Sequence, residues 1–541
     1  MPVVPITQLA DGGVNFDTPA VVLPLNTYSD CRNVRFDNHS VRKMEGHTAL
    51  YGSTAIASQV EGLVYWPRII NPGYIFANNT ETDSFLNLIN EFGQSIPLGN
   101  GYNPAGKWQF SQYNGGYTII ANNDLSSVNT TDKDYPQFVT SGPQSTEQTF
   151  ARLPGWPDNL YAGVVRPADN VLIAGNLEER PDAMTIRYMP GTIRISSRAA
   201  PGSLPTVWDV TTQDVLGLTT ADDFELSQTS PVKEIVSLRG YFLIFTGNSI
   251  HRVELANREG GATTVNNLNS GRGVLSTGCA IEFDGNVFAV DANDIYISNG
   301  AGGITSVSDQ ITRDYFQVTL NQTYMDNTFV IRNISQDEIW VCYPTFESED
   351  GRCDRALVWN YLHKTWTVRD LPATVVGTLG PIISGTGAEA VFEGRTDHVI
   401  LSGYDNRGDV NNPPPASNNV HIMDEGFTHN GDIYTAFIER KRIGVEPTDF
   451  NKYVKGFYPW FDPDTTTSPT ITIKTRGQDL ITENVSLETD ELTQLEFEMG
   501  YDYKVELHER GRVLNYRIET TDENTWNLAG IGLDVSGDGR R

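Results

Sequence analysis

The sequence predicts an all-β protein: a β-propeller with degenerate blades and an insertion, followed by a C-terminal β-sandwich-like domain. The chain has 541 residues with 49 glycines and 28 prolines, so turns are frequent. Short apolar strands recur along most of its length, whereas amphipathic helical patterns are scarce. Where the repeat is clearest, the offset between strand pairs is about 43–44 residues, the length of a four-stranded propeller blade.

Three parts are expected along the chain. Residues 1–50 form an N-terminal segment with a hairpin, residues 51–410 the propeller, and residues 411–541 the sandwich-like domain. A chain of this length can bury several large cores.

The N-terminal stretch Gly13–His47 is rich in turns. Asp17-Thr18-Pro19 is a turn signal. Asn33–Phe36 alternates polar and apolar residues, and Asp37–Ser40 turns the chain into a second short strand, Val41–Lys43. We expect this hairpin either to complete a blade or to pack against the sandwich.

The propeller is predicted from repeated strand pairs. Two early units share one layout: a strand, a turn with Gly, an aromatic-rich strand and then Ala-Asn-Asn. Such sheets cannot bury both faces alone, but packing around a common axis buries them. The expected strands are Gly62–Trp66, Gly73–Asn79, Trp108–Tyr113, Gly115–Asn123, Val232–Leu238, Gly240–Phe245, Ser249–Val253, Ala280–Phe283, Asn286–Val290, Asp294–Ile297, Phe329–Arg332, Glu338–Tyr343, Ala356–Asn360, Trp366–Val368, Ala390–Phe392 and His398–Leu401.

The strand pattern is interrupted once within the propeller and ends at a linker after its last unit. The proline-rich region of about 140–225 is expected to be an irregular blade or an inserted subdomain. Ala390–Phe392 and His398–Leu401 are expected to form the last unit together. The composition of Asp409–Asn418 is that of a linker.

After the linker, strict alternation of polar and apolar residues predicts half-buried strands of a sandwich. The expected strands are Tyr434–Ile438, Lys452–Tyr458, Thr470–Lys474, Gln494–Phe497, Tyr503–Leu507 and Tyr516–Glu519.

The formal net charge of −29 predicts an acidic surface. Nucleic-acid binding through phosphate contacts needs basic patches, so this charge argues against it. It does not argue against DNA passing nearby, because acidic walls of a channel repel phosphates and let DNA slide.

The cysteines Cys31, Cys279, Cys342 and Cys353 form no CxxC pair, so a zinc site is not expected. Cys342 and Cys353 could meet across a hairpin, although buried free thiols in a reducing cytoplasm are the usual case. The first 13 residues lack the charged start and apolar centre of a signal peptide, and no apolar run approaches about 18 residues.

No reactive constellation is apparent, so we expect no catalytic, cofactor-binding or metal-binding residues and no enzyme activity. Gly101–Lys107 has the spacing of a phosphate-binding loop, but Trp108 and a strand follow it; its glycines fit a turn between blades better. Ser348–Gly351 resembles a sialidase turn only in part. The eight histidines are scattered, and His421 and His429 fall in a linker-like region.

Two further runs have alternative interpretations. Glu439–Arg442 is the most basic run of the chain and is expected to be a solvated edge strand, or else a docking patch for an acidic partner. Phe457–Phe461 is an aromatic run and is expected to lie in the core; if exposed, it would mark an interface.

Two stretches at opposite ends resemble the tail nozzle proteins of short-tailed phages, the tail tubular protein B family. The first comprises Gly13–Asp17, Leu23-Pro24, Asp30–Phe36 and Glu45–His47. The second is Gly511–Glu519 followed by Trp526–Val535. Together they cover roughly 60 residues.

The resemblance implies a virion structural protein without catalytic residues. Six copies would form a ring below the tail adaptor and continue the DNA channel, retaining packaged DNA and releasing it into the host during genome ejection. The implied partners are further copies of the chain, the adaptor, tail fibres, double-stranded DNA in transit and the host envelope. Loops that move aside are expected in 140–225 or in Phe346–Asp354.

The residues leave competing functions open. One is a glycan-binding or glycan-cleaving propeller of a phage or bacterium. Glycoside hydrolysis needs two carboxylates about 5–10 Å apart, which a sequence does not reveal. Another is a secreted bacterial adhesion or scaffold propeller, which the expected lack of a signal peptide disfavours.

Overall fold

The computed structural model describes most of the chain in ordered segments. The described residues are 3–50, 56, 59–67, 72–79, 83–90, 93–102, 107–122, 135–141, 149–182, 185–211, 221–227, 230–255, 263–348, 350–384, 391–392, 397–404, 418–444, 451–462, 469–479, 485–487 and 493–537.

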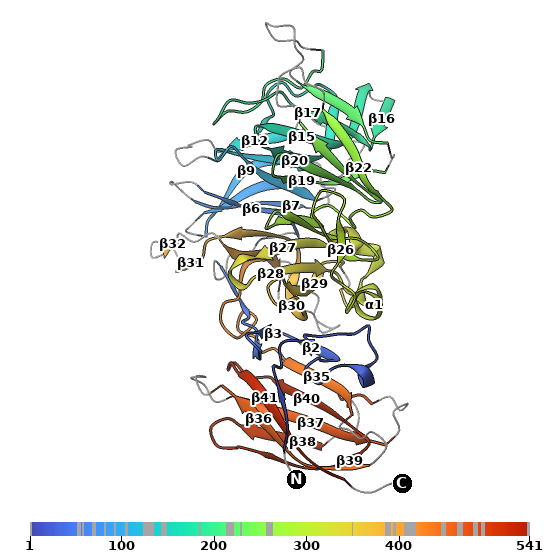
Figure 1. Ribbon diagram of the computed structural model, residues 1–541. Coiled ribbons are helices and arrows are strands. Elements are labelled where there is room, and N and C mark those ends of the chain that lie inside the picture. The colour runs from blue at the N-terminus through green and yellow to red at the C-terminus, as the bar shows by residue number, and fades with distance from the viewer. Residues whose placement is uncertain are drawn as a thin grey trace.

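These residues confirm the predicted fold class: a β-propeller joined to a β-sandwich. Figure 1 shows the propeller above the sandwich, with both chain ends at the sandwich end. The few helical turns are short: η1 (Ala20–Val22), η3 (Thr312–Phe316), α1 (Gln317–Thr319), η4 (Gln322–Asn327) and η5 (Ile334–Gln336). None of the helices that the structure describes has the length and apolar character that crossing a bilayer requires.

The first five blades are separate antiparallel sheets, each built from consecutive strands. Their first strands contact one another in sequence around a common axis. The strands of each blade are given from the axis outward. Blade 1 is β6 (Gln59–Trp66), β7 (Gly73–Asn79), β8 (Ser84–Asn90) and β9 (Ser95–Tyr102); blade 2 is β10 (Trp108–Tyr113), β11 (Tyr117–Asn122), β12 (Gln137–Thr140) and β13 (Ala151–Arg152); blade 3 is β14 (Leu160–Ala168), β15 (Val171–Asp182), β17 (Thr192–Ile195) and β18 (Asp222–Glu225). Blade 4 is β19 (Val232–Leu238), β20 (Tyr241–Thr246), β21 (Ser249–Glu254) and β22 (Thr264–Ser270); blade 5 is β23 (Ala280–Phe283), β24 (Asn286–Val290), β25 (Ile295–Ser298) and β26 (Ile304–Ser306).

The last two blades share one long strand, β30 (Thr365–Gly380). Its first half completes blade 6, after β27 (Phe329–Asn333), β28 (Glu338–Tyr343) and β29 (Cys353–Asn360). Its second half pairs with β33 (His398–Tyr404) and begins blade 7. A register shift between Thr374 and Val376 separates the two halves. Such a bulge bends a strand, which lets one strand serve two sheets.

Blade 7 is closed by the N-terminal part of the chain. Its order is β30, β33, β34 (Asn419–Met423) and β5 (His47–Ala49), with Met423 opposite His47. The blade therefore continues past the expected boundary at residue 410. Because its outer strand comes from the start of the sequence, the propeller ring is closed by two distant segments.

The sandwich also needs both ends of the chain. One sheet has the order β3-β4-β41-β36-β39, with β1 also on β41; the other has the order β2-β35-β40-β37-β38. The bounds are β1 (Val4–Thr7), β2 (Asp30–Arg32), β3 (Val34–Asp37), β4 (Ser40–Lys43), β35 (Ala436–Ile443), β36 (Lys452–Phe461), β37 (Thr470–Gln478), β38 (Thr493–Glu498), β39 (Val505–Gly511), β40 (Val513–Thr520) and β41 (Asn527–Gly537).

Two expectations about the propeller are settled by strand pairing. The region 140–225 is an irregular blade, because β14–β18 form one sheet to which β16 (Thr185–Met189) adds beside β15. The expected pairing of Ala390–Phe392 with His398–Leu401 is wrong. β32 (Val391–Phe392) pairs with β31 (Ile383–Ser384) in a hairpin, whereas β33 continues the sheet of blade 7.

Trp526 and Trp460 give a matched test of the sandwich core. Trp526 is fully buried, whereas Trp460 is 40% exposed. We expect Trp526→Ala to lower the free energy of unfolding by about 3–5 kcal/mol, because it leaves a large cavity. Trp460→Ala should cost roughly half as much, because part of this side chain already lies in water. Urea unfolding measures both, and equal losses would contradict this assignment of the core.

Candidate functional site

The N-terminal segment lies between the propeller and the sandwich, and we call this region the junction (Figure 1). The backbone N–H of Asn33 donates to the carbonyl of Val368 on β30 at 2.8 Å. The hydroxyl of Thr367 donates to the carbonyl of Val34 at 2.6 Å. One cluster of buried apolar side chains continues from blades 4–6 through this segment into the sandwich. The two domains therefore share a core.

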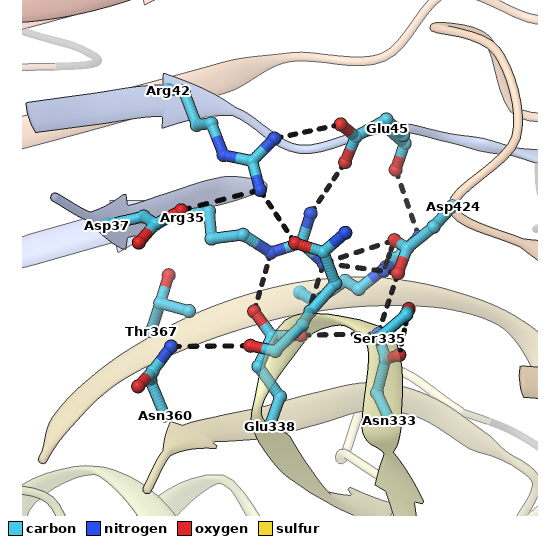
Figure 2. Close-up of polar contacts among 12 residues, drawn as sticks. Arg35, Asp37, Arg42, Glu45, Asn333, Ser335, Glu338, Asn360, Thr367 and Asp424 are labelled. Atoms are coloured by element: carbon cyan, nitrogen blue, oxygen red, sulfur yellow. Dashed lines mark hydrogen bonds and ion pairs between the residues drawn. The ribbon is translucent and has the colours of Figure 1, made fainter. Parts of the chain in front are cut away.

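Arg35 on β3 is the centre of the polar contacts at the junction (Figure 2). It is 1% exposed. Its Nε and Nη2 donate to the two carboxylate oxygens of Glu338 on β28, at 2.5 and 3.1 Å. Its Nη1 donates to Glu45 at 2.6 Å, and its Nη2 lies 3.2 Å from both oxygens of Asp424, just after β34. One guanidinium thus joins the sandwich to blades 6 and 7.

The carboxylates around Arg35 receive further donors. Asn333 Nδ2 donates to Asp424 at 2.7 Å, and Trp340 Nε1 donates to Glu338 at 2.9 Å. Arg369 on β30, also 1% exposed, donates to Asp424. Burial by itself raises the pKa of Asp424, but the charges of Arg35 and Arg369 outweigh it and hold that pKa well below its ordinary value.

We call Arg35, Arg42, Arg369, Glu45, Glu338 and Asp424 the Arg35 cluster. Its three cations and three carboxylates balance. At its rim, Arg42 donates to Glu45 at 3.1 Å and to Gln336 at 2.7 Å. Buried charges are tolerated when they are paired and hydrogen-bonded, and removal of one partner leaves the other uncompensated. The cluster therefore stabilises the junction only when all the strands that carry its residues are in their native positions.

Beside the cluster, four rings pack together where β5 closes blade 7; three are stacked, and His421 meets His47 edge-on. His47 lies 4.5 Å from His429 and 5.2 Å from His421 between ring centroids, and Tyr434 stacks on His429 at 4.2 Å. The Tyr434 hydroxyl donates to the carbonyl of Met44. His421 was expected in a linker but lies buried on β34, because β34 pairs with β33. No group of three His, Cys, Asp or Glu residues among those described could hold a metal ion.

A cavity of about 210 Å³ lies on the propeller axis between the inner strands β6, β10, β14, β27 and β30. Arg166 lines the cavity and pairs with Glu234, with Nε and Nη2 at 2.7 and 3.0 Å from the two carboxylate oxygens. The N–H of Gly278 donates to the same carboxylate at 2.8 Å. This pair is neutral, so the cavity wall is largely uncharged apart from Lys107.

The segment Gly101–Lys107 connects β9 to β10, as a turn between blades would. Residues 103–106 of this segment lie outside the described residues. Lys107 lines the cavity, and its Nζ donates to the backbone carbonyl of Asp326 at 3.1 Å. Ser348 and Asp350 of the sialidase-like turn are hydrogen-bonded to each other at 3.2 Å in the loop between β28 and β29, and Glu349 lies outside the described residues.

The interpretation of Glu439–Arg442 as a solvated edge strand is wrong, whereas the docking patch stays a prediction. These residues lie on β35, between β2 and β40, so the strand is not an edge. Arg440 is 1% exposed, and its guanidinium donates to the carbonyls of Ala20 at 2.6 Å and Leu23 at 2.7 Å. Arg440 therefore anchors the N-terminal segment, which also supplies β2 beside this strand.

The aromatic run Phe457–Phe461 divides between two faces of β36. Phe457 is fully buried, as expected, whereas Trp460 is exposed, as strand alternation allows. The four cysteines are free and buried. Burial raises the pKa of the Cys31 thiol to about 12.

Sequence reasoning missed the Arg35 cluster. Arg35 occupies a polar position of an alternating strand, and its partner Glu338 lies 303 residues away. One signal was available. Glu338 begins β28, a strand buried along its whole length, and a carboxylate in such an apolar run requires a buried cation.

Comparisons with known proteins add little. No protein-family model and no curated protein matches the sequence. Among solved structures, BBS1N in complex with ARL6DN aligns at 8% identity over 70% of this chain and 97% of its own, with a TM-score of 0.35. AztD of Citrobacter koseri aligns at 11% identity over 66% and 87%, with a TM-score of 0.30. At these scores, we base no argument on either likeness.

Arg35→Met tests how much the Arg35 cluster contributes to stability. This change leaves the buried carboxylate of Glu338 without its counter-charge and removes one partner from the partly buried Asp424 and Glu45. We therefore expect a loss of about 3–5 kcal/mol in the free energy of unfolding. Arg187→Met is the matched control, because Arg187 is 68% exposed in its ion pair with Glu179; it should cost less than about 1 kcal/mol. Similar losses in urea unfolding would contradict the role of Arg35.

Glu61 on β6 makes stability depend on pH. Burial raises its pKa from 4.5 to about 7, against the opposing charges of Lys107 and Arg352. The folded protein thus binds this proton more tightly than the unfolded chain, and stability falls as pH rises from about 4.5 through about 7. We expect Glu61→Gln to raise stability by on the order of 2–3 kcal/mol at pH 8 and to leave it nearly unchanged at pH 4.

The control for Glu61 is Glu506→Gln, since the Glu506 side chain is 77% exposed. Thermal unfolding of both variants from pH 4 to pH 8 gives the comparison. A Glu61→Gln effect that does not vary with pH would contradict the shifted titration.

Proposed function

We propose that this chain is the nozzle subunit of a short-tailed phage tail. In this role it is a virion structural protein whose ring continues the DNA channel below the adaptor, retains packaged DNA and releases it during genome ejection. The observation that carries the proposal is the meeting of the two stretches that resemble the nozzle family. Phe36 of the first pairs with Val41 on β4, and Val41 in turn pairs with Leu528 of the second. Cys31 of the first lies on β2, beside β35, whose other neighbour is β40.

The meeting of these ends matters because residues 48–510 separate the two stretches in the sequence and yet both belong to one folded unit. A likeness limited to both ends of a chain is difficult to interpret when the ends are structurally unrelated. Here β3 of the first stretch and β41 of the second are separated by β4 alone in one sheet, so both stretches lie in the same part of the sandwich.

The mechanical character of the junction supports the same proposal. A subunit that confines packaged DNA must resist load without its domains separating. The Arg35 cluster and the shared apolar core join the propeller to the sandwich at several points. Charge is also consistent with the proposal, because the net charge of −29 would repel DNA phosphates from a channel wall.

In the proposed assembly, six copies form the ring, the adaptor lies above it, and fibres or other host-binding proteins attach nearby. The protein would be made in the host cytoplasm and located in the virion. The chain would act on the host envelope through the complete tail and without chemistry of its own.

Light scattering after size-exclusion chromatography tests the proposal. We expect either a six-copy ring or a monomer that forms the ring when the tail adaptor is added. The same preparation is incubated with polysaccharide from the host surface. A monomer that ignores the adaptor and binds or cleaves the polysaccharide would overturn the nozzle and favour the glycan-processing alternative.

A further inference from the structure

The cavity of about 210 Å³ on the propeller axis has a buried polar atom in its wall that the described residues leave without a hydrogen bond. That atom is Oε1 of Gln109, on β10. We propose that the cavity binds one small, neutral molecule of the phenol class, whose hydroxyl donates a hydrogen bond to Gln109 Oε1. This inference goes beyond the proposed function and does not depend on the assembly of a ring.

The side-chain amide of Gln109 is held in one orientation. Its Nε2 donates to the backbone carbonyl of Gly163 on β14 at 2.9 Å. Exchange of the amide oxygen and nitrogen would turn Oε1 toward that carbonyl, and two acceptors form no hydrogen bond. The side chain is only 5% exposed, and a buried acceptor without a donor lowers stability. A molecule in the cavity that brings a donor to Oε1 would remove this cost.

Most of the residues that line the cavity are apolar, which favours a ligand with a hydrocarbon body. Removal of such surfaces from water is favourable. Aromatic rings also pair well with one another in offset or edge-to-face arrangements, whereas each hydroxyl of a sugar would need a polar partner. The apolar lining includes two aromatic rings and comes from several strands: Leu63, Val64, Phe110, Phe329, Val330 and Val376.

Other polar side chains in the wall already have partners within the protein. The guanidinium of Arg166 pairs with Glu234 through Nε and Nη2, and its Nη1 donates to Ser111 Oγ at 3.0 Å. The hydroxyl of Thr378 donates to the carbonyl of Leu379 at 3.3 Å. One donor on the ligand, directed at Gln109, therefore matches what the wall requires.

The charges around the cavity favour a neutral ligand. Arg166 and Glu234 balance each other. The ammonium of Lys107 donates to the carbonyls of Asp326 and Thr328 at 3.1 and 3.4 Å, and its charge acts on the carboxyl group of Glu61. An anionic ligand beside Lys107 would also meet Glu61 and the exposed Asp326, whereas a cationic ligand would be repelled by Lys107.

The volume limits the ligand to the size of a substituted benzene. An apolar cavity of about 150 Å³ is large enough for benzene. A cavity of about 210 Å³ therefore has room for a ring with a hydroxyl and a methyl group. Water alone would fill this space only as several molecules, each with about three hydrogen bonds, and the apolar residues of the wall provide none of these bonds.

A ligand at this place would connect the inner strands of distant blades. The lining residues come from β6, β10, β14, β27 and β30, which belong to blades 1, 2, 3, 6 and 7. These strands surround the cavity only when the propeller is closed. Binding would therefore stabilise the closed propeller over any open form.

The probe that tests this site is 4-methylphenol, and toluene, which lacks only the hydroxyl, is its matched control. Ligand-observed NMR titrations of the full chain give the dissociation constant of each compound. We expect saturable binding of 4-methylphenol and at least about tenfold weaker binding of toluene, because toluene would separate Gln109 Oε1 from any donor. A chain that does not bind 4-methylphenol, or that binds both compounds equally, would overturn the proposal.

Two variants locate the site. Gln109→Met removes the acceptor, so the preference for 4-methylphenol over toluene should fall at least about fivefold. The loss of the bond to Gly163 affects both compounds alike, because the preference is measured within one variant. Thr277→Trp, at a half-buried position in the wall, should abolish binding of both compounds by filling the cavity. Thr264→Trp, at an exposed position on β22, is its control and should change neither affinity.

The variants also give outcomes that contradict the site. An unchanged preference in Gln109→Met would overturn the hydrogen bond to Oε1, and binding that survives Thr277→Trp would place the ligand elsewhere. Circular dichroism confirms that each variant is folded, and if Thr277→Trp fails to fold, Gln109→Met decides alone. None of these results depends on the oligomeric state, so the proposed nozzle is tested separately.

Discussion

The buried charge of Arg35 is the constraint on which the arrangement of the two domains depends. A guanidinium that is 1% exposed must find acceptors for its N–H groups inside the protein, and those of Arg35 are the carboxylates of three residues. Glu338, Glu45 and Asp424 come from blade 6, the N-terminal segment and the end of blade 7, so these parts must meet at one point. The requirement is directional, because hydrogen bonds fix the orientation of the guanidinium as well as its position.

The N-terminal segment does three structural tasks. It supplies β1–β4 to the sandwich, brings Arg35 to the junction and then supplies β5 to close blade 7. A propeller has free edges until its last blade is closed, and closure by a distant segment makes the ring cooperative. Because the same segment spans both domains, opening the propeller would also disturb the sandwich, and the molecule behaves as one body.

The strand pattern could be predicted because it depends on local alternation. Val232–Leu238, Ala280–Phe283 and Glu338–Tyr343 have the bounds that the sequence predicted. The candidate site could not be predicted in this way. Arg35 occupies a polar position of an alternating strand, and Arg440 was interpreted as part of a solvated strand, since an alternating strand has one face in water. Both are buried because another part of the chain covers that face, and alternation contains no information about such a cover.

By itself, the sequence determined the all-β class, the blade repeat and the change to a sandwich after the linker, because side-chain periodicity is a property of each short segment. The tertiary structure decided which strands are neighbours: β5 in blade 7, β4 beside β41 and β30 in two blades at once. It also decided which charges are buried. These features depend on contacts between residues hundreds of positions apart, where packing and charge compensation act together on the whole fold.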